Sequence, residues 1–339
     1  MIKIRTRYLW LAIVAIAVAA CQKKTATEPA NNADKSSLDT TINYEQEMRT
    51  FIQDISAYAR QQSPNFLIMP QDGLTLLTAT GDSTGTPVAA YLAAINGVGQ
   101  EEVYYGYDNQ DDAATPASIR KAYLSMLRLA KNNGKAPLVT DYCTTSSKIT
   151  ASYTNNFNNG WVSYAATSRE LDNFATTAPY NVNTNNINSL SDAWNFLYLI
   201  NPQNETNKTA FLNKLRATNF DVLILDFAFN DDSEPLTAAD VQSLKTKANG
   251  GKRIVLAYMS IAQAEDYRFY WKRSWLNNPP AWLVTSIDPD WEGDYNVRYW
   301  MSDWKNIIYG NDASYTKKLL NAGFDGAYLD LYDYQYWEN

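Results

Sequence analysis

Several carboxylates stand directly after short apolar runs that read as buried strands. Asp226 ends Val-Leu-Ile-Leu-Asp, Asp330 ends Gly-Ala-Tyr-Leu-Asp, and Asp141 ends Leu-Val-Thr-Asp. For any one of them, a helix cap or a surface salt bridge is the simpler role. If the strands are parallel and close into a barrel, however, these acids converge at one face, where like charges repel and must be compensated. Carboxylates gathered in this way can act as general acid, base or nucleophile.

Composition removes other kinds of chemistry. Histidine is absent from the 339 residues, which excludes Ser-His-Asp triads and His-ligated zinc sites. The net charge of -7 argues against nucleic acid and permits a neutral or cationic partner. Neither a glycine-rich phosphate cradle nor the spacing of a calcium loop is present, so we expect no cofactor and no metal.

Aromatic and amide residues accompany the carboxylates. Flat aromatic faces with amides and carboxylates suit a sugar, whose ring stacks and whose hydroxyls need acceptors. Core packing is an equally good explanation for about half of the tyrosines. We take Asp226 and Asp330 as the candidate catalytic pair. The candidate substrate contacts are Gln71, Glu101, Tyr105, Asp141, Tyr258, Glu265, Asp266, Arg268, Trp300 and Tyr328.

The elements that must position these residues alternate between helix and strand. Met48, Phe51, Ile52 and Ile55 form the buried stripe of a first helix. Further helices are predicted over 118–133, 208–217, from Thr237 to Gly250, and over 313–321. Eight strand candidates indicate an α/β fold of the (β/α)8 TIM-barrel type, and a doubly wound open sheet is the alternative. The strand candidates are 66–69, 103–105, 137–140, 196–199, 222–225, 254–258, 296–300 and 326–329.

The first residues read as a targeting segment. Basic residues precede an apolar run, and Val-Ala-Ala-Cys then places small residues before Cys21, as in a bacterial lipoprotein signal over 1–21. An uncleaved membrane anchor is the alternative, although the apolar run is short for a span. Residues 22–43 would be a flexible tether and 44–339 a single barrel domain. We therefore expect a monomer at the bacterial cell envelope, extracytoplasmic and attached to the membrane by a lipid on Cys21.

Two segments carry a family resemblance. Residues 259–268 and 324–330 resemble glycoside hydrolase family 114, the endo-α-1,4-polygalactosaminidases and their extracellular bacterial relatives. Some of those relatives were long labelled cysteinyl-tRNA synthetase-related, but the synthetase signature needs histidines that this chain lacks. The resemblance implies a (β/α)8 barrel, catalysis by carboxylates, and a polysaccharide substrate of α-1,4-linked galactosamine.

The order of the resembling segments differs from that of the family. The Pro-Gln-Asp-Gly half precedes the strand at 194–199 here, whereas the family has the reverse order. We read this as a circular permutation, with the Asn- and Thr-rich stretch 173–192 joining the family's usual termini. The strand at 326–330 should then flank the strand at 66–69, and the joint should lie at the surface.

Two local departures keep a second function open. Tyr328 stands where the polygalactosaminidases have a glutamate, and Gln263 stands where relatives carry a glutamate. The first hypothesis is a glycoside hydrolase that acts on an amino-sugar polysaccharide through Asp226 and Asp330. The second is a noncatalytic carbohydrate-binding lipoprotein that kept the barrel and lost an essential acid.

Overall fold

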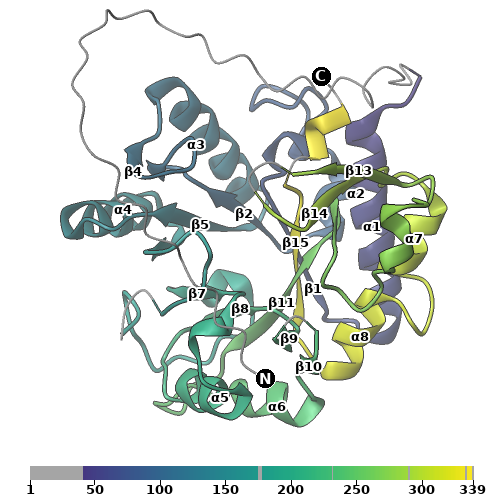
Figure 1. Ribbon diagram of the computed structural model, residues 1–339. Coiled ribbons are helices and arrows are strands. Elements are labelled where there is room, and N and C mark those ends of the chain that lie inside the picture. Colours follow the sequence, from purple (N-terminus) through teal and green to yellow (C-terminus); the bar gives the residue numbers. More distant parts are fainter. Residues whose placement is uncertain (1–40, 175–177, 231, 289–290, 333, 338–339) are drawn as a thin grey trace, which may run out of the picture. The chain divides into compact units, whose positions relative to one another are not determined.

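Eight parallel strands form a nearly closed barrel in the computed structural model, which describes residues 41–174, 178–230, 232–288, 291–332 and 334–337 (Figure 1). The α/β fold of the (β/α)8 type is therefore confirmed. Hydrogen-bonded neighbours follow the order β6-β5-β2-β1-β15-β11-β8-β7. The barrel strands are β1 (Leu67–Gln71), β2 (Gly97–Glu101), β5 (Ala136–Tyr142), β6 (Val162–Ala166), β7 (Phe196–Leu199), β8 (Val222–Leu225), β11 (Ile254–Ser260) and β15 (Gly326–Asp330).

The first and last strands pair in parallel. Leu67 lies opposite Gly326 and Gln71 lies opposite Asp330, so the predicted pairing of these two segments is confirmed. The sheet order ends at β6 on one side and β7 on the other, and among the described strands no ladder joins these two. The described part of 173–192 connects them and is mostly exposed, with Pro179, Ile187 and Leu190 as its buried members.

Two predicted barrel strands were wrong, and two real ones were missed. The segment 103–105 is not a barrel strand; β2 lies just before it and contains Gly97 and Gly99. A Cβ on Gly97 would stand 2.6 Å from the carbonyl oxygen of Ala136, so the close neighbour requires the residue that weakens the strand pattern. The segment 296–300 overlaps β14, which belongs to a small antiparallel sheet. The missed strand β6 is built largely from small residues, Val-Ser-Tyr-Ala-Ala.

The five helices predicted from the sequence are present, and three further helices, Ala89–Ala94, Ser146–Asn159 and Ser302–Ile308, were not predicted. Asn43 caps the first helix, because its side chain accepts a hydrogen bond from the Gln46 amide at 2.9 Å, and the helix buries Phe51 and Ile52. The helix that begins after Thr237 has the expected capping box but ends at Leu244, well before Gly250. The helices are α1 (Tyr44–Gln62), α2 (Ala89–Ala94), α3 (Ala117–Asn132), α4 (Ser146–Asn159), α5 (Lys208–Arg216), α6 (Ala238–Leu244), α7 (Ser302–Ile308) and α8 (Tyr315–Ala322).

Short additional strands follow the carboxyl ends of three barrel strands. A hairpin follows β2, a two-residue ladder follows β8, and a three-stranded antiparallel sheet is inserted between β11 and β15. These excursions position several of the side chains described below. They are β3 (Tyr105–Gly106), β4 (Gln110–Ala114), β9 (Ala228–Phe229), β10 (Glu234–Pro235), β12 (Gln263–Glu265), β13 (Leu283–Ile287) and β14 (Asp294–Val297).

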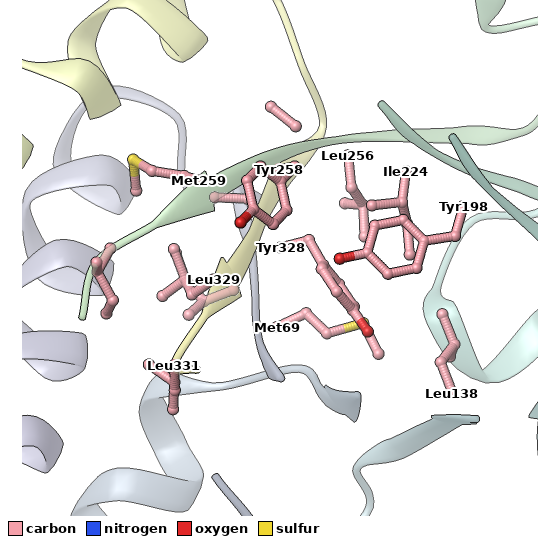
Figure 2. Close-up of a cluster of buried hydrophobic side chains, with 14 of the residues drawn as sticks. Met69, Leu138, Tyr198, Ile224, Leu256, Tyr258, Met259, Tyr328, Leu329 and Leu331 are labelled. Carbon is pink, nitrogen blue, oxygen red and sulfur yellow. The ribbon is translucent and has the colours of Figure 1, made fainter. Parts of the chain in front are cut away.

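Tyrosines fill the barrel interior beneath its carboxyl-end face. The rings of Tyr198 and Tyr328 meet edge to face at 5.2 Å, with Met69 and Leu138 close by (Figure 2). The Tyr198 hydroxyl donates to the side-chain carbonyl of Gln71 at 2.9 Å. Because both rings are almost fully buried, they form a floor under the residues at the strand ends.

The predicted lipoprotein signal, the lipidated Cys21 and nearly all of the tether lie outside the described residues. Within the part of the chain that is described, no helix has the length and apolar character needed to cross a bilayer.

Candidate active site

A pocket of about 550 Å³ opens where the barrel strands end. Side chains from strand ends all round the barrel line it, the location at which barrel enzymes carry their active sites. Its described lining is rich in acids: seven carboxylates face two guanidinium groups, those of Arg169 and Arg268. The carboxylates are Asp72, Glu101, Glu102, Asp226, Glu265, Asp294 and Asp330.

Asp330 is the last residue of β15. Its Oδ2 accepts a hydrogen bond from the Tyr258 hydroxyl at 2.6 Å, and its Oδ1 accepts one from the Tyr332 amide at 2.9 Å. Burial raises the pKa of the Asp330 carboxyl, the two hydrogen bonds oppose that rise, and the charge of Glu265 adds to it. No arginine or lysine is paired with this carboxylate among the described ion pairs.

Asp226 follows β8 and lies in a buried ion-pair network. Its carboxylate lies 2.7 Å from Nη1 of Arg268, whose side chain is 1% exposed. The same guanidinium binds Glu265 at 2.6 Å and Asp232 at 3.3 Å. Burial raises the pKa of Asp226 to about 6 despite the opposing charge of Arg268. Asp226 therefore lines the pocket while its carboxylate is held in the ion-pair network of Arg268.

Glu101 and Asp72 form a second acidic group beside Asp330. Glu101 Oε1 accepts a hydrogen bond from the Tyr142 hydroxyl at 2.8 Å. Asp72 has a left-handed backbone with φ of 57°, and its Oδ1 accepts from the Glu101 amide at 3.1 Å. Burial raises the pKa of Asp72 to about 7, and burial together with the charge of Asp72 raises the pKa of Glu101 well above its ordinary value. A carboxyl that keeps its proton near neutral pH can serve as a general acid.

Asp294, at the start of β14, is a pocket carboxylate that sequence reasoning missed. Burial and the charges of Glu265 and Asp330 raise its pKa to about 9. It comes from the antiparallel insertion and not from the end of a barrel strand, so no strand-end pattern points to it.

Seven of the residues predicted from the sequence meet in the pocket. They are Gln71, Glu101, Asp226, Tyr258, Glu265, Arg268 and Asp330.

The other five predicted residues are not among the residues that line it. Asp141 is fully buried and accepts hydrogen bonds from the Tyr104 amide at 2.8 Å and from Ser152 at 2.6 Å. Its carboxylate thus holds the start of the β3–β4 hairpin against α4 instead of reaching the pocket. Tyr328 lies in the barrel floor, 1% exposed.

The remaining three predicted residues, Trp300, Asp266 and Tyr105, lie in the structure around the pocket. Trp300 packs edge to face against Tyr44 at 4.9 Å and against Trp337 at 5.0 Å. Asp266 is exposed, and its backbone amide donates to the carbonyl of Gly293 at 2.9 Å. Tyr105 is half-buried in the β3–β4 hairpin.

The described residues contain no group of three or more acidic or cysteine side chains arranged to hold a metal ion.

The fold and the site together define a (β/α)8 barrel with an acid-lined pocket at its carboxyl-end face. Residues 175–339 match the model of the glycoside-hydrolase family GH114. This match supports a place in the GH114 superfamily and the prediction of a glycoside hydrolase.

Curated relatives are similar over part of their length. An uncharacterized protein of Methanocaldococcus jannaschii, MJ1477, is 39% identical over 156 residues, which cover 46% of this chain and 41% of that protein. An uncharacterized protein of Thermotoga maritima is 38% identical over 125 residues, covering 37% of this chain and 36% of that protein. One from Deinococcus radiodurans is 38% identical over 129 residues, covering 38% of each. These alignments thus span about two fifths of the relatives' lengths.

Proposed function

We propose that this protein is a glycoside hydrolase that cleaves an amino-sugar polysaccharide, similar to endo-α-1,4-polygalactosaminidases, by a two-carboxylate mechanism. The observation that carries the proposal is the excess of carboxylates over guanidinium groups in the pocket. Such a pocket attracts ammonium groups and disfavours anionic sugars. A polymer of galactosamine, with an ammonium on each unacetylated ring, has the complementary charge.

Asp330 and Glu101 are the carboxylates whose contacts best suit the chemistry. Each accepts a hydrogen bond from a neutral tyrosine hydroxyl, and the charge of Asp330 contributes to the raised pKa of Glu101. One carboxyl donates its proton to the glycosidic oxygen as the bond to the anomeric carbon breaks. The other attacks that carbon or removes a proton from the attacking water, depending on the separation of the two groups.

Asp226 is the partner of Asp330 in the prediction made from sequence. Both residues line the pocket, and the assignment of Asp226 stays a prediction. Its ion pair with Arg268 favours an alternative role, in which Asp226 holds Arg268 and Glu265 in place.

The test compares three conservative variants, Asp330→Asn, Glu101→Gln and Asp226→Asn, on α-1,4-galactosamine oligomers. Loss of an acid or base should lower the rate by about 10² to 10⁴-fold. We expect this loss for Asp330→Asn and Glu101→Gln, and a smaller loss for Asp226→Asn. A large loss for Asp226→Asn with near-normal activity of Glu101→Gln would restore the pair predicted from sequence.

A noncatalytic carbohydrate-binding protein is the second candidate. It is favoured by one observation: Tyr328 occupies the position of the glutamate in polygalactosaminidases and lies buried in the barrel floor. Oligomers that bind to the wild-type protein without any shortened product would establish this candidate.

We also propose that the barrel is circularly permuted relative to its family. The family match begins at residue 175, inside the predicted joint 173–192. The sheet order also ends at β6 and β7, the strands on either side of that joint. Pairing of β1 with β15 is compatible with permutation but is also what closure of any such barrel needs.

For the localisation of the protein, we propose that it is a monomer at the bacterial cell envelope, attached to the membrane by a lipid on Cys21. The support is the run of small residues before Cys21. The variant Cys21→Ser should leave the membrane fraction while its fold is unchanged. If it stayed with the membrane, the apolar run itself would be the anchor.

A further inference from the structure

The carboxylates are unevenly distributed around the wall of the pocket. All seven carboxylates of the described lining come from the ends of β8, β15, β1 and β2 and from the segments inserted after β11. The stretch of wall from β5 to β7 contributes none. We call this stretch the carboxylate-free sector; it consists of Tyr142, Arg169, Leu171, Tyr198, Ile200 and Asn201.

Leu171 occupies this sector with an unusual backbone. Its φ is 47°, a left-handed conformation that costs free energy for a leucine. The carbonyl oxygen of Leu171 accepts hydrogen bonds from the amides of Ile200 at 3.1 Å and Asn201 at 3.2 Å. These bonds hold the strained residue in place and bring two apolar side chains together at the wall. Strain that persists in this way is often associated with a functional site.

Asn201 adds a directional polar group to the two apolar side chains. Its Nδ2 donates to the carbonyl oxygen of Glu170 at 2.6 Å, which fixes the amide plane. The Oδ1 atom is then the atom that Asn201 can offer to an N–H donor on a ligand.

Arg169 gives the same sector a fixed positive charge. Its guanidinium binds Glu102 at 2.7 Å and Asp111 at 3.1 Å and lies 4.4 Å from the ring centre of Tyr142. The carboxylates nearest this sector are already engaged, since Glu102 and Asp111 bind Arg169 and Glu101 accepts the hydrogen bond of Tyr142, so an ammonium group on a bound sugar would meet apolar carbons and paired carboxylates here. An uncharged sugar fits this wall better.

We propose that the carboxylate-free sector is a subsite for an N-acetylated amino sugar. The rest of the wall, which carries the seven carboxylates, takes an unacetylated one. The acetyl methyl group packs against Leu171 and Ile200, and the acetamido N–H donates to Oδ1 of Asn201. A cavity of about 550 Å³ falls within the range of ligand pockets that enclose a drug-sized molecule, which is larger than one sugar ring. This inference rests on the proposed function and adds that the preferred substrate is a partially acetylated polymer.

The first test is made on products. Partially N-acetylated α-1,4-galactosamine oligomers are digested, and mass spectrometry locates the acetylated rings relative to each cleaved bond. We expect the wild-type protein to enrich acetylated rings at one fixed position. Ile200→Asp should reduce that enrichment about tenfold, the lower end of what one apolar contact contributes to discrimination. The control is Val182→Asp, which adds the same charge at an exposed residue outside the pocket lining.

The second test does not depend on hydrolysis. Saturation-transfer difference NMR with N-acetylgalactosamine should show the methyl protons receiving the strongest signal. Leu171→Gly should weaken that signal, because glycine tolerates the left-handed backbone while removing the apolar side chain. It also replaces Ile200→Asp if that variant fails to fold.

The outcomes separate the two proposals. A methyl signal that Leu171→Gly weakens, without any hydrolysis, would overturn the glycosidase and keep the subsite. Hydrolysis with acetylated rings scattered at random, together with a methyl signal unchanged in Leu171→Gly, would overturn the subsite and keep the glycosidase.

Discussion

The Tyr258 hydroxyl donates a hydrogen bond to Oδ2 of Asp330 at 2.6 Å, from β11 to the neighbouring strand β15. Ser260 lies opposite Asp330 in this ladder, so Tyr258 stands two residues earlier along its strand. The bond stabilises the ionised carboxylate, whereas burial favours the protonated form. The proton affinity of Asp330 is thus set by opposing effects that a single oxygen atom on Tyr258 can change.

Removing that oxygen should change the pH dependence of hydrolysis. In Tyr258→Phe the ionised form of Asp330 loses a hydrogen-bond donor, so the pKa of Asp330 should rise. A hydrogen bond to a charged group contributes about 1.5–3 kcal/mol, which corresponds to a rise of about one to two pKa units. The limb of the kcat/KM profile that reports Asp330 should move to higher pH. The control is Tyr58→Phe, which removes a hydroxyl that donates to Asn311 outside the pocket. Identical profiles for Tyr258→Phe and the wild type would show that this hydrogen bond does not control the titration of Asp330.

Arg268 should be essential for stability. Its side chain is 1% exposed and binds Asp226, Glu265 and Asp232, so Arg268→Gln would leave carboxylates buried without their counter-charge. The loss in free energy of unfolding should be about 3–5 kcal/mol, measured by urea denaturation. The exposed ion pair of Lys214 with Glu205 is the control, and Lys214→Ala should cost no more than about 1 kcal/mol. Equal effects of the two substitutions would show that the buried network is not the source of stability.

Asp294 should make the protein less stable as the pH rises. Its folded pKa of about 9 exceeds that of an unfolded aspartate, so between these values unfolding releases a proton that the folded protein keeps. The thermal midpoint should therefore fall from pH 5 to pH 9. Asp294→Asn removes this titration and should recover at least about 1 kcal/mol of the loss, the equivalent of one pKa unit. Asp312→Asn, at an exposed site, should follow the wild type, and a matching pH slope in Asp294→Asn would refute the prediction.

Gly99 and Tyr328 should be energetically coupled. A Cβ on Gly99 would collide first with the hydroxyl oxygen of Tyr328 and then with its ring. Gly99→Ala should therefore destabilise the protein by about 1–3 kcal/mol. Tyr328→Phe removes the nearest atom, so the double variant should be more stable than the sum of the two single changes predicts. Strict additivity would show that the barrel floor adjusts elsewhere.

The glycines of β2 show how far the sequence predicts the fold. Continuous apolar runs such as Val222–Leu225 and Ile254–Tyr258 identify barrel strands directly, because strands buried on both faces need such residues. β2 carries Gly97 and Gly99 instead, since neighbouring atoms approach its backbone closely. That requirement comes from other barrel strands, the paired strand β5 at Gly97 and Tyr328 of β15 at Gly99, and is invisible in the local pattern.

The residues of the pocket likewise fall into two groups, those that the sequence places and those that it does not. Asp226 and Asp330 could be placed because they end barrel strands, and that position fixes the face on which they lie. Asp294 reaches the same pocket from the insertion after β11, and Arg169 reaches it from the loop after β6. Their positions depend on how long loops fold back over the barrel. Asp141 also ends a strand, yet backbone amides and α4 occupy its carboxylate.

Digestion of α-1,4-galactosamine oligomers in ¹⁸O-labelled water, followed by mass spectrometry, tests directly whether this protein is a glycoside hydrolase. A glycoside hydrolase adds one oxygen atom from water to each new reducing end. We expect shortened products that carry a single ¹⁸O with the wild-type protein and none above background with Asp330→Asn. Intact oligomers after incubation with folded wild-type protein, or equal cleavage by Asp330→Asn, would contradict the proposed function.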